Sequence, residues 1–255
     1  MLRRCAIIIG ASNVAGQEPL PGTVQDTRNW RAFLKSELGG SWDDEEIQML
    51  QKPTSCGISR LLEQHKGEYI FLAFSGHGEE KYCEAKQRNS LYVCLNDEEN
   101  SVDVDSITPT LFGTAIFDCC RGFYEAYGIE ESLNTGVAAP FVLAQMFSGT
   151  NRFYRSSRDV FVQSLQSVMG YPTVRMYSCR RGESAGEDPC AGGFYTTLLI
   201  KGANAWRERQ KHCARRSVFT TRQAHTFACT AMKQINPEQH PEYRPTRVCY
   251  PFAVH

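Results

Sequence analysis

Two short segments of the sequence carry residue types that could perform thiol chemistry, and each directly follows an apolar run. The run YIFLAF leads into SGHG (residues 75–78), and the run TAIF leads into DCCRG (residues 118–122). A thiol with an ordinary pKa of about 8.5 needs an imidazole within hydrogen-bond reach to form the thiolate and later to protonate a leaving amine. The flanking glycines leave backbone N–H groups accessible to an oxyanion. The two segments together therefore indicate nucleophilic catalysis by a cysteine and a histidine.

The two segments meet only if their strands are neighbours, and the rest of the sequence predicts a fold that allows this. Strand-like apolar runs alternate with amphipathic runs, which indicates an α/β domain on a mostly parallel sheet. Ligands bind beyond the carboxyl ends of the strands in such sheets. The expected strands are 5–10, 45–50, 69–75, 91–95, 114–119, 173–179 and 248–254, and the expected helices are 24–38, 58–65, 193–200 and 221–235. Residues 138–170 lack a clean period and are predicted to form a long surface loop.

Composition narrows the class of protein. The chain of 255 residues is 42% hydrophobic, which suits one large domain, 1–255, with a sizeable core. Lys plus Arg and Asp plus Glu number 28 each, so no global field attracts nucleic acid or an anionic membrane. No apolar segment approaches the ~20 residues that span a bilayer, and the first residues do not read as a signal sequence. We expect a soluble, cytoplasmic protein without nucleic-acid or membrane partners.

The eleven cysteines include no CxxC pair of the kind that holds zinc. Their number is odd and the chain is large, so we expect reduced, mostly buried thiols rather than a disulfide scaffold or a metal site. Cys5, Cys94 and Cys179 lie inside apolar or strand-like runs and are expected to be inert.

The histidine and cysteine segments, about 40 residues apart and in this order, resemble those of the caspase, metacaspase and paracaspase superfamily of cysteine peptidases. The resemblance extends over most of the chain, through CAIIIGASN, PGTVQDTRNWRAFL, MYSCRRGESAGEDPCAGGFYTTLL and YPFAV. It implies a caspase-like three-layer sandwich, with a mostly parallel sheet of about six strands flanked by helices. Residues 138–170 would then link the large and small parts of a single peptidase domain.

The resemblance also assigns roles at the site. His77 and Cys120 would be the catalytic pair, and the backbone N–H groups of Gly78 and Cys120 would form the oxyanion hole. Cys119 occupies the position before the nucleophile, and strand alternation turns its side chain to the opposite face.

Substrate specificity can be predicted from charge. Asp118 lies two residues before Cys120, so on a strand both side chains share one face. The resemblance implies that Asp26, in the first expected helix, converges on the same pocket. Two carboxylates in one small pocket favour Arg or Lys before the scissile bond. The alternative for Asp26 is a solvated residue in the first turn of a helix, where the macrodipole favours an acid.

The segment SCRRGESAGED borders the substrate cleft in relatives, which makes Ser178, Glu183 and Ser184 candidate substrate contacts, with Glu183 able to add to the acidic pocket. A solvated polar loop is the simpler interpretation. Arg180 and Arg181 would disfavour a basic substrate if they pointed inwards, so we expect them to point outwards.

Two regulatory features are open at this stage. Arg152, Arg155 and Arg158 lie where relatives are often cut, so a basic-specific enzyme could cleave itself there, or the arginines could form an exposed loop without function. The acidic run NDEENSVDVD, residues 96–105, could bind calcium, which metacaspases often need. Its spacing does not match an EF-hand, and a solvated loop is the favoured interpretation.

We therefore expect a cysteine endopeptidase that cleaves after Arg or Lys and processes a partner protein in a death, defence or signalling pathway, with an activating partner as a further expectation. The alternative is a catalytically silent caspase-like scaffold, against which the intact His77 and Cys120 segments argue. A nucleotide-binding protein is disfavoured because GASNVAG lacks both the P-loop ending and the GxGxxG spacing.

Overall fold

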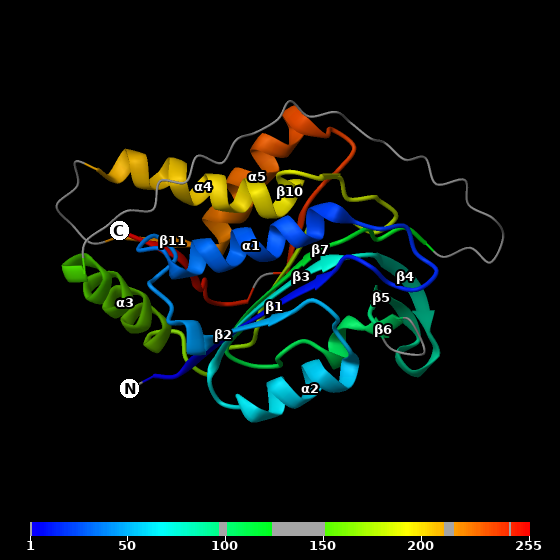
Figure 1. The fold of residues 1–255 in the computed structure, drawn as a ribbon, viewed down its shortest axis with the longest axis horizontal. Coiled ribbons are helices and arrows are strands. Elements are labelled where there is room, and N and C mark those ends of the chain that lie inside the picture. Colours follow the sequence, from blue (N-terminus) through cyan, green and yellow to red (C-terminus); the bar gives the residue numbers. More distant parts are fainter. Residues whose placement is uncertain (1, 97–100, 124–150, 212–216, 245) are drawn as a thin grey trace.

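The computed structural model describes residues 2–96, 101–123, 151–211, 217–244 and 246–255 (Figure 1). Its centre is a six-stranded sheet in the order β12-β8-β7-β3-β1-β2. The strands are β1 (Arg4–Ala11), β2 (Ile47–Leu50), β3 (Tyr69–Gly76), β7 (Gly113–Asp118), β8 (Val174–Tyr177) and β12 (Glu242–Arg244). Five of them run parallel and β12 pairs antiparallel with β8. The predicted α/β fold with a mostly parallel sheet of about six strands is confirmed.

Helices cover both faces of this sheet, which makes three layers (Figure 1). α1 (Pro21–Lys35), α4 (Phe194–Gln210) and α5 (Thr221–Ile235) lie on one face, and α2 (Ser55–Gln64) lies on the other. In β1, Ala6 and Ile8 pack in the core beneath the first group, while Cys5, Ile7 and Ile9 pack in the core beside α2. The strand is apolar on both faces because both are covered, as is usual for a central parallel strand.

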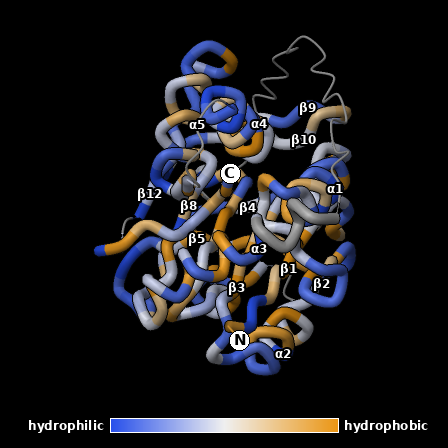
Figure 2. Tube along the Cα trace, turned by 90° about the vertical axis from the view of Figure 1, so that its left-hand side faces the viewer, coloured by the Kyte–Doolittle hydropathy of each residue, from blue (hydrophilic) through white to orange (hydrophobic). Residues whose placement is uncertain are grey.

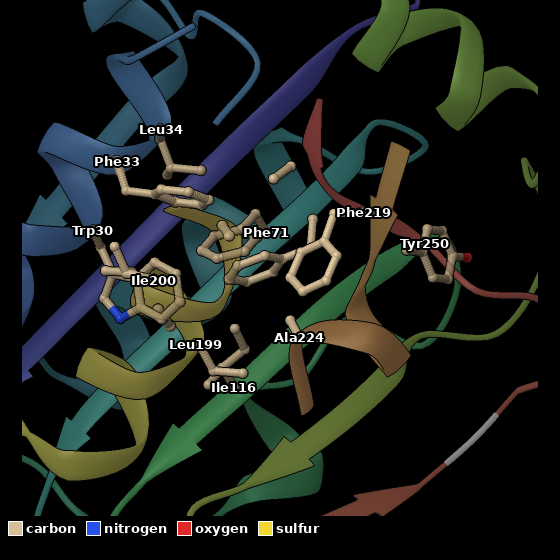
Figure 3. Packing of buried hydrophobic residues seen from close by; sticks show 14 of the residues in the cluster. Trp30, Phe33, Leu34, Phe71, Ile116, Leu199, Ile200, Phe219, Ala224 and Tyr250 are labelled. Atoms are coloured by element: carbon tan, nitrogen blue, oxygen red, sulfur yellow. The ribbon is translucent and has the colours of Figure 1, made fainter. Parts of the chain in front are cut away.

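The larger core is aromatic (Figure 3). Trp30 and Phe33 of α1 meet Phe71 of β3, with ring centroids of Trp30 and Phe71 5.2 Å apart. Leu199 and Ile200 of α4 close the cluster. Hydrophobic residues concentrate along central strands such as β1 and β3, and hydrophilic residues lie at the periphery (Figure 2). Among the described residues, no helix is both long and apolar enough to span a membrane.

Three small sheets lie outside the central one. β4 (Gly78–Cys83), β5 (Arg88–Cys94) and β6 (Ser101–Asp103) form an antiparallel sheet, β9 (Glu187–Asp188) pairs with β10 (Gly192–Gly193), and β11 (Val218–Thr220) pairs with β13 (Pro251–Val254). Short 3₁₀ helices occur at Asp44–Glu46, Glu84–Lys86 and Val104–Ser106. The expected last strand thus forms as β13 but joins β11, and β12, which the sequence did not indicate, completes the central sheet.

The prediction of a surface loop at 138–170 is wrong in its second half. α3 (Asn151–Gln166) is a helix whose Phe161 and Leu165 are buried in the larger core. Phe161 packs edge-on against Trp42, with ring centroids 5.8 Å apart. Phe161 and Leu165 are four residues apart, which is a helical spacing. The polar residues that precede them interrupt the apolar pattern, so the helix was not predicted. Residues 138–150 lie outside the described part of the chain.

Candidate active site

The two chemistry-bearing segments leave the sheet side by side. β3 and β7 are parallel neighbours, with Phe74 opposite Phe117 and Ser75 opposite Asp118. Both strands end at the same edge, so His77 follows one strand and Cys120 follows the other. The expected adjacency of these strands is confirmed, and it places the candidate site where open α/β sheets bind ligands.

Gly78 brings the two segments into contact. A Cβ atom on Gly78 would lie 2.7 Å from Cys119 Sγ and 2.8 Å from the Cys120 carbonyl oxygen, so only glycine fits without a shift. β4 begins at this glycine, directly after His77. His77 and Cys120 are half-buried, whereas Cys119 is buried. The structure therefore brings the histidine segment against the cysteine pair and leaves Cys120 the more accessible thiol.

The His77 ring is oriented by the backbone of Glu18. Its Nε2 lies 2.7 Å from the Glu18 carbonyl oxygen. Because a carbonyl oxygen can only accept, Nε2 carries the hydrogen and Nδ1 keeps the lone pair. Nδ1 is then the nitrogen that can take a proton from a thiol. Glu18 precedes α1 in a loop, and nothing in its residue type marks this role in the sequence.

The two neighbouring thiols have different surroundings. The backbone N–H of Ala185 donates to Cys120 Sγ at 3.3 Å, a contact that favours a thiolate, and the Ala185 carbonyl oxygen lies 3.8 Å from the same sulfur, where it can accept from the thiol form. Burial raises the pKa of the Cys119 thiol well above its ordinary value, and the nearby Cys179 raises it further. Cys119 is thus held in the unreactive thiol form.

A buried ion-pair network holds the residue after Cys120. Arg121 donates to Glu80 of β4 through Nε at 2.8 Å and to Glu242 of β12 through Nη1 at 2.6 Å. Its guanidinium also lies 4.5 Å from the ring centroid of Tyr177. The side chains of Arg121 and Glu80 are 1% and 0% exposed, so this ion pair is buried away from water. Breaking it would leave a buried charge without a partner, which holds Arg121 in this one position. It ties the cysteine segment to two other strands.

Asp26 and Asp118 lie together in the interior next to this segment. Ser75 Oγ donates to Asp26 Oδ2 at 2.5 Å, the Gly193 N–H donates to Asp26 Oδ1 at 2.9 Å, and the Thr196 N–H donates to Asp118 Oδ2 at 2.8 Å. Burial, and after it the charge of Asp118, raises the pKa of Asp26 well above its ordinary value. Burial also raises the pKa of Asp118. Asp26 is therefore buried and not the solvated helix residue of the alternative interpretation.

Glu187 is a third carboxyl group at the same place, and sequence reasoning missed it. Its Oε1 accepts from the Gly22 N–H at 3.2 Å. Burial, followed by the charge of Asp118, raises the pKa of Glu187. The three carboxyl groups thus receive hydrogen bonds from hydroxyl and backbone N–H groups. The only sequence signal for Glu187 was its place as the second acidic residue of GESAGED. In the structure it is the first residue of β9, which pairs with β10.

The other three candidate contacts are placed differently. Ser178 is buried, and its Oγ accepts from the Cys119 N–H at 3.1 Å and donates to the Cys119 carbonyl at 3.0 Å, so it fixes backbone. The Glu183 carboxylate binds His240 through two contacts of 2.9 Å, which corrects its expected place in the acidic pocket. Ser184 is exposed. Arg180 and Arg181 are also exposed, as expected for side chains that point outwards.

The described part of the acidic run is paired with basic side chains. Lys86 Nζ lies 2.7 Å from Asp103 and 2.5 Å from Asp105, and Arg175 also pairs with Asp105. Calcium would have to displace these cations, and residues 97–100 lie outside the described part. Among the described residues, no cluster of three His, Cys, Asp or Glu side chains could hold a metal ion.

Fold and site together define an α/β domain in which a histidine segment and a cysteine segment meet at the carboxyl edge of the sheet. The caspase-domain peptidase family matches residues 3–250, and the chain belongs to this family. It is 22% identical to Metacaspase-1A of Aspergillus fumigatus over 80% of this chain and 60% of that protein. It is also 22% identical to Metacaspase-1 of Kluyveromyces lactis over 82% of this chain and 49% of that protein.

The chain therefore spans about half to three-fifths of the length of these two curated relatives. Among solved structures, caspase-1 from Spodoptera frugiperda matches with a TM-score of 0.59, covering 98% of this chain and 90% of that one. At 14% sequence identity this likeness concerns the fold alone. It agrees with the expected caspase-like layer arrangement.

Proposed function

We propose that the protein is a cysteine endopeptidase that cleaves peptide bonds after Arg or Lys. The observation that carries the specificity is the buried pair Asp26 and Asp118, whose pKa values are raised by burial. Such a pair is unfavourable when both groups are ionised, and a bound guanidinium or ammonium removes the repulsion. An acidic substrate side chain would add a like charge instead. Glu187 adds a third carboxyl group, which strengthens the preference for a cation.

In this proposal Cys120 is the nucleophile and His77 the proton carrier. Nδ1 of His77 takes the thiol proton, and the thiolate attacks the carbonyl carbon of the scissile bond to form a tetrahedral oxyanion. The backbone N–H groups of Gly78 and Cys120 stabilise this oxyanion. The carbon–nitrogen bond then breaks, His77 protonates the leaving amine, and a thioester remains. Water, deprotonated by His77, hydrolyses the thioester and regenerates the thiol.

The substrate would be a partner protein with Arg or Lys in an accessible, extended segment, and a reducing cytoplasm suits the enzyme. No disulfide joins the ten cysteines in the described ranges. Burial raises the pKa of Cys94 to about 11 and that of Cys5 to about 12, so these thiols resist reaction while Cys120 stays accessible.

The proposal is tested with matched fluorogenic peptides that end in Arg, Lys, Asp or Gln. Wild type is compared with Cys120→Ala, Cys119→Ala and His77→Ala. We expect cleavage after Arg and Lys that is abolished by Cys120→Ala, reduced at least 100-fold by His77→Ala and retained in Cys119→Ala. Cleavage after Asp would refute the acidic pocket. A silent scaffold would cleave none of the peptides and would not be labelled at Cys120 by an arginyl acyloxymethyl ketone.

A further inference from the structure

Residues 178–187, which comprise the loop after β8 and the first residue of β9, contribute to the site at two points. The Ala185 N–H donates to Cys120 Sγ at 3.3 Å, and Glu187 supplies the third carboxyl group beside Asp118. The position of this loop therefore sets both the hydrogen bond to the thiol and the charge of the pocket.

Several contacts hold this loop. Its middle is held by the cysteine segment, since the Arg121 N–H donates to the Glu183 carbonyl at 2.9 Å and the Gly182 N–H donates to the Arg121 carbonyl at 2.8 Å. The part that follows Ala185 is held at Gly186, whose carbonyl accepts from the Phe194 N–H at 3.0 Å and whose N–H donates to a side chain from the turn after α5. Gln239 Oε1 accepts from the Gly186 N–H at 3.0 Å.

Gln239 also reaches the beginning of the same loop. Its Nε2 donates to the Ser178 carbonyl at 2.9 Å, so one amide spans both ends of the 178–187 loop. Gln239 is only 2% exposed. An N–H group can only donate and a carbonyl can only accept. The side-chain oxygen of Gln239 therefore faces Gly186, and its nitrogen faces Ser178. Asn236 supports the arrangement by donating from Nδ2 to Gln239 Oε1 at 3.3 Å.

We propose that Gln239 is a positioning residue for the Cys120 thiolate, a role that rests on the proposed function of Cys120. By holding Gly186, it keeps the adjacent Ala185 N–H directed at the sulfur. A donor directed at a sulfur favours the charged thiolate, so a displaced loop raises the pKa of Cys120 and lowers the fraction of reactive enzyme. The side-chain hydrogen bonds of Gln239 go to Gly186, Ser178 and Asn236.

Replacing Gln239 removes none of the other ionisable groups around Cys120. They are His77 after β3, Asp118 at the end of β7, Cys119 and Arg121 beside Cys120 in the chain, and Cys179 and Glu183 of the 178–187 region. A change in the titration of Cys120 in a Gln239 variant therefore reports the position of the loop.

The test is the pH dependence of Cys120 alkylation by iodoacetamide, resolved by peptide mass spectrometry. Gln239→Met keeps the length of the side chain and removes both hydrogen bonds. We expect its midpoint to lie about 0.5–1 pH unit above that of wild type, and kcat on an Arg peptide to fall about 10-fold with a smaller change in KM. The exposed Cys56 and Cys190 are internal controls in the same samples, and Gln234→Met, at an exposed position of α5, is the matched variant.

A folded Gln239→Met protein with the wild-type midpoint and kcat overturns the inference. If the buried Cys5 and Cys94 become alkylated, the variant has unfolded, and Gln239→Asn decides instead. This variant keeps the amide but is one methylene shorter, so it cannot reach both Gly186 and Ser178, and its midpoint should also rise; a folded Gln239→Asn protein with the wild-type midpoint overturns the inference. Alkylation needs no substrate, so the comparison of midpoints tests the inference whether or not the wild type cleaves the peptides.

Discussion

The carboxyl groups of Asp26 and Asp118 flank Gly193, although one comes from α1 and the other from the end of β7. A Cβ atom on Gly193 would lie 3.0 Å from Asp26 Oδ2 and closer still to Asp118 Oδ2. Glycine at this position lets the β9–β10 hairpin close over the pair. Burial raises the pKa of both groups, so ionisation of both carboxyl groups is unfavourable in the free protein and becomes favourable when a cation binds beside them.

Asp26→Asn should separate activity from stability. Removal of one negative charge should lower kcat/KM for an Arg peptide by about 10- to 100-fold, because a buried charge-assisted contact contributes about 1.5–3 kcal/mol. The same substitution should stabilise the free protein, since an amide can keep the partners of the carboxyl group without its charge. A gain of about 1 kcal/mol would raise Tm by about 2–4 °C.

Calorimetry and peptide kinetics on the same preparation check this prediction. Asp159→Asn, at an exposed position of α3, is the control and should change neither quantity. A lower Tm in Asp26→Asn would show that the ionised carboxylate stabilises the fold, contrary to its raised pKa.

The affinity for a basic ligand should increase with pH. The pKa of Asp26 is raised in the folded protein, so the carboxyl group stays protonated above the ordinary Asp value of about 3.9. Binding of a cation then requires loss of a proton, and the inhibition constant of a reversible ligand such as agmatine should fall as pH rises through the raised pKa. Stability has the opposite trend: the folded state binds the extra proton, so this contribution is lost as pH rises through the same range.

Inhibition constants measured across this range for wild type and Asp26→Asn would check the pH dependence. The variant should show the flatter profile, because one of the two coupled carboxyl groups no longer titrates. Equal slopes in the two proteins would exclude Asp26 as the group that controls binding.

Gly78→Ala should abolish most activity while the protein stays folded. The added Cβ would lie within 3 Å of both Cys119 Sγ and the Cys120 carbonyl oxygen, so the cysteine segment must move away from His77. A displacement of this kind should reduce kcat at least 100-fold. Gly122→Ala is the matched control, since its Cβ would meet nothing within 4 Å. Steady-state kinetics with circular dichroism would check both variants, and near-normal kcat in Gly78→Ala would contradict the assigned close approach.

Self-cleavage between the two parts of the domain should not occur. Residues 122–151 contain no Lys or Arg, and Arg152, Arg155 and Arg158 lie within α3. Arg158 is also paired with Glu46 and Asp43. Because a peptidase cleft binds extended chain, cleavage there requires α3 to unwind. Intact-mass spectrometry after prolonged incubation should show one full-length chain, with Cys120→Ala as control; a fragment that ends at Arg152, Arg155 or Arg158 in wild type alone would contradict this.

The secondary structure was predictable where it depends on local pattern. Apolar runs such as YIFLAF and TAIF form β3 and β7, because a strand buried on both faces needs continuous apolar residues. α3 and β12 were missed for a physical reason. In α3, the apolar residues lie among more numerous polar and charged ones, so the helical period is hard to detect in the sequence. β12 is short and is a strand because it pairs with β8, which a local pattern does not show.

The sequence by itself determined the site residues that neighbour one another along the chain. His77 comes directly after β3, and Asp118 ends β7 two residues before Cys120. Only the tertiary structure decided which distant groups join them: Glu18 at the imidazole, Glu187 at the carboxyl pair and Gln239 behind the loop. These contacts depend on sheet order and loop path, and neither is encoded in the local periodicity that a sequence displays.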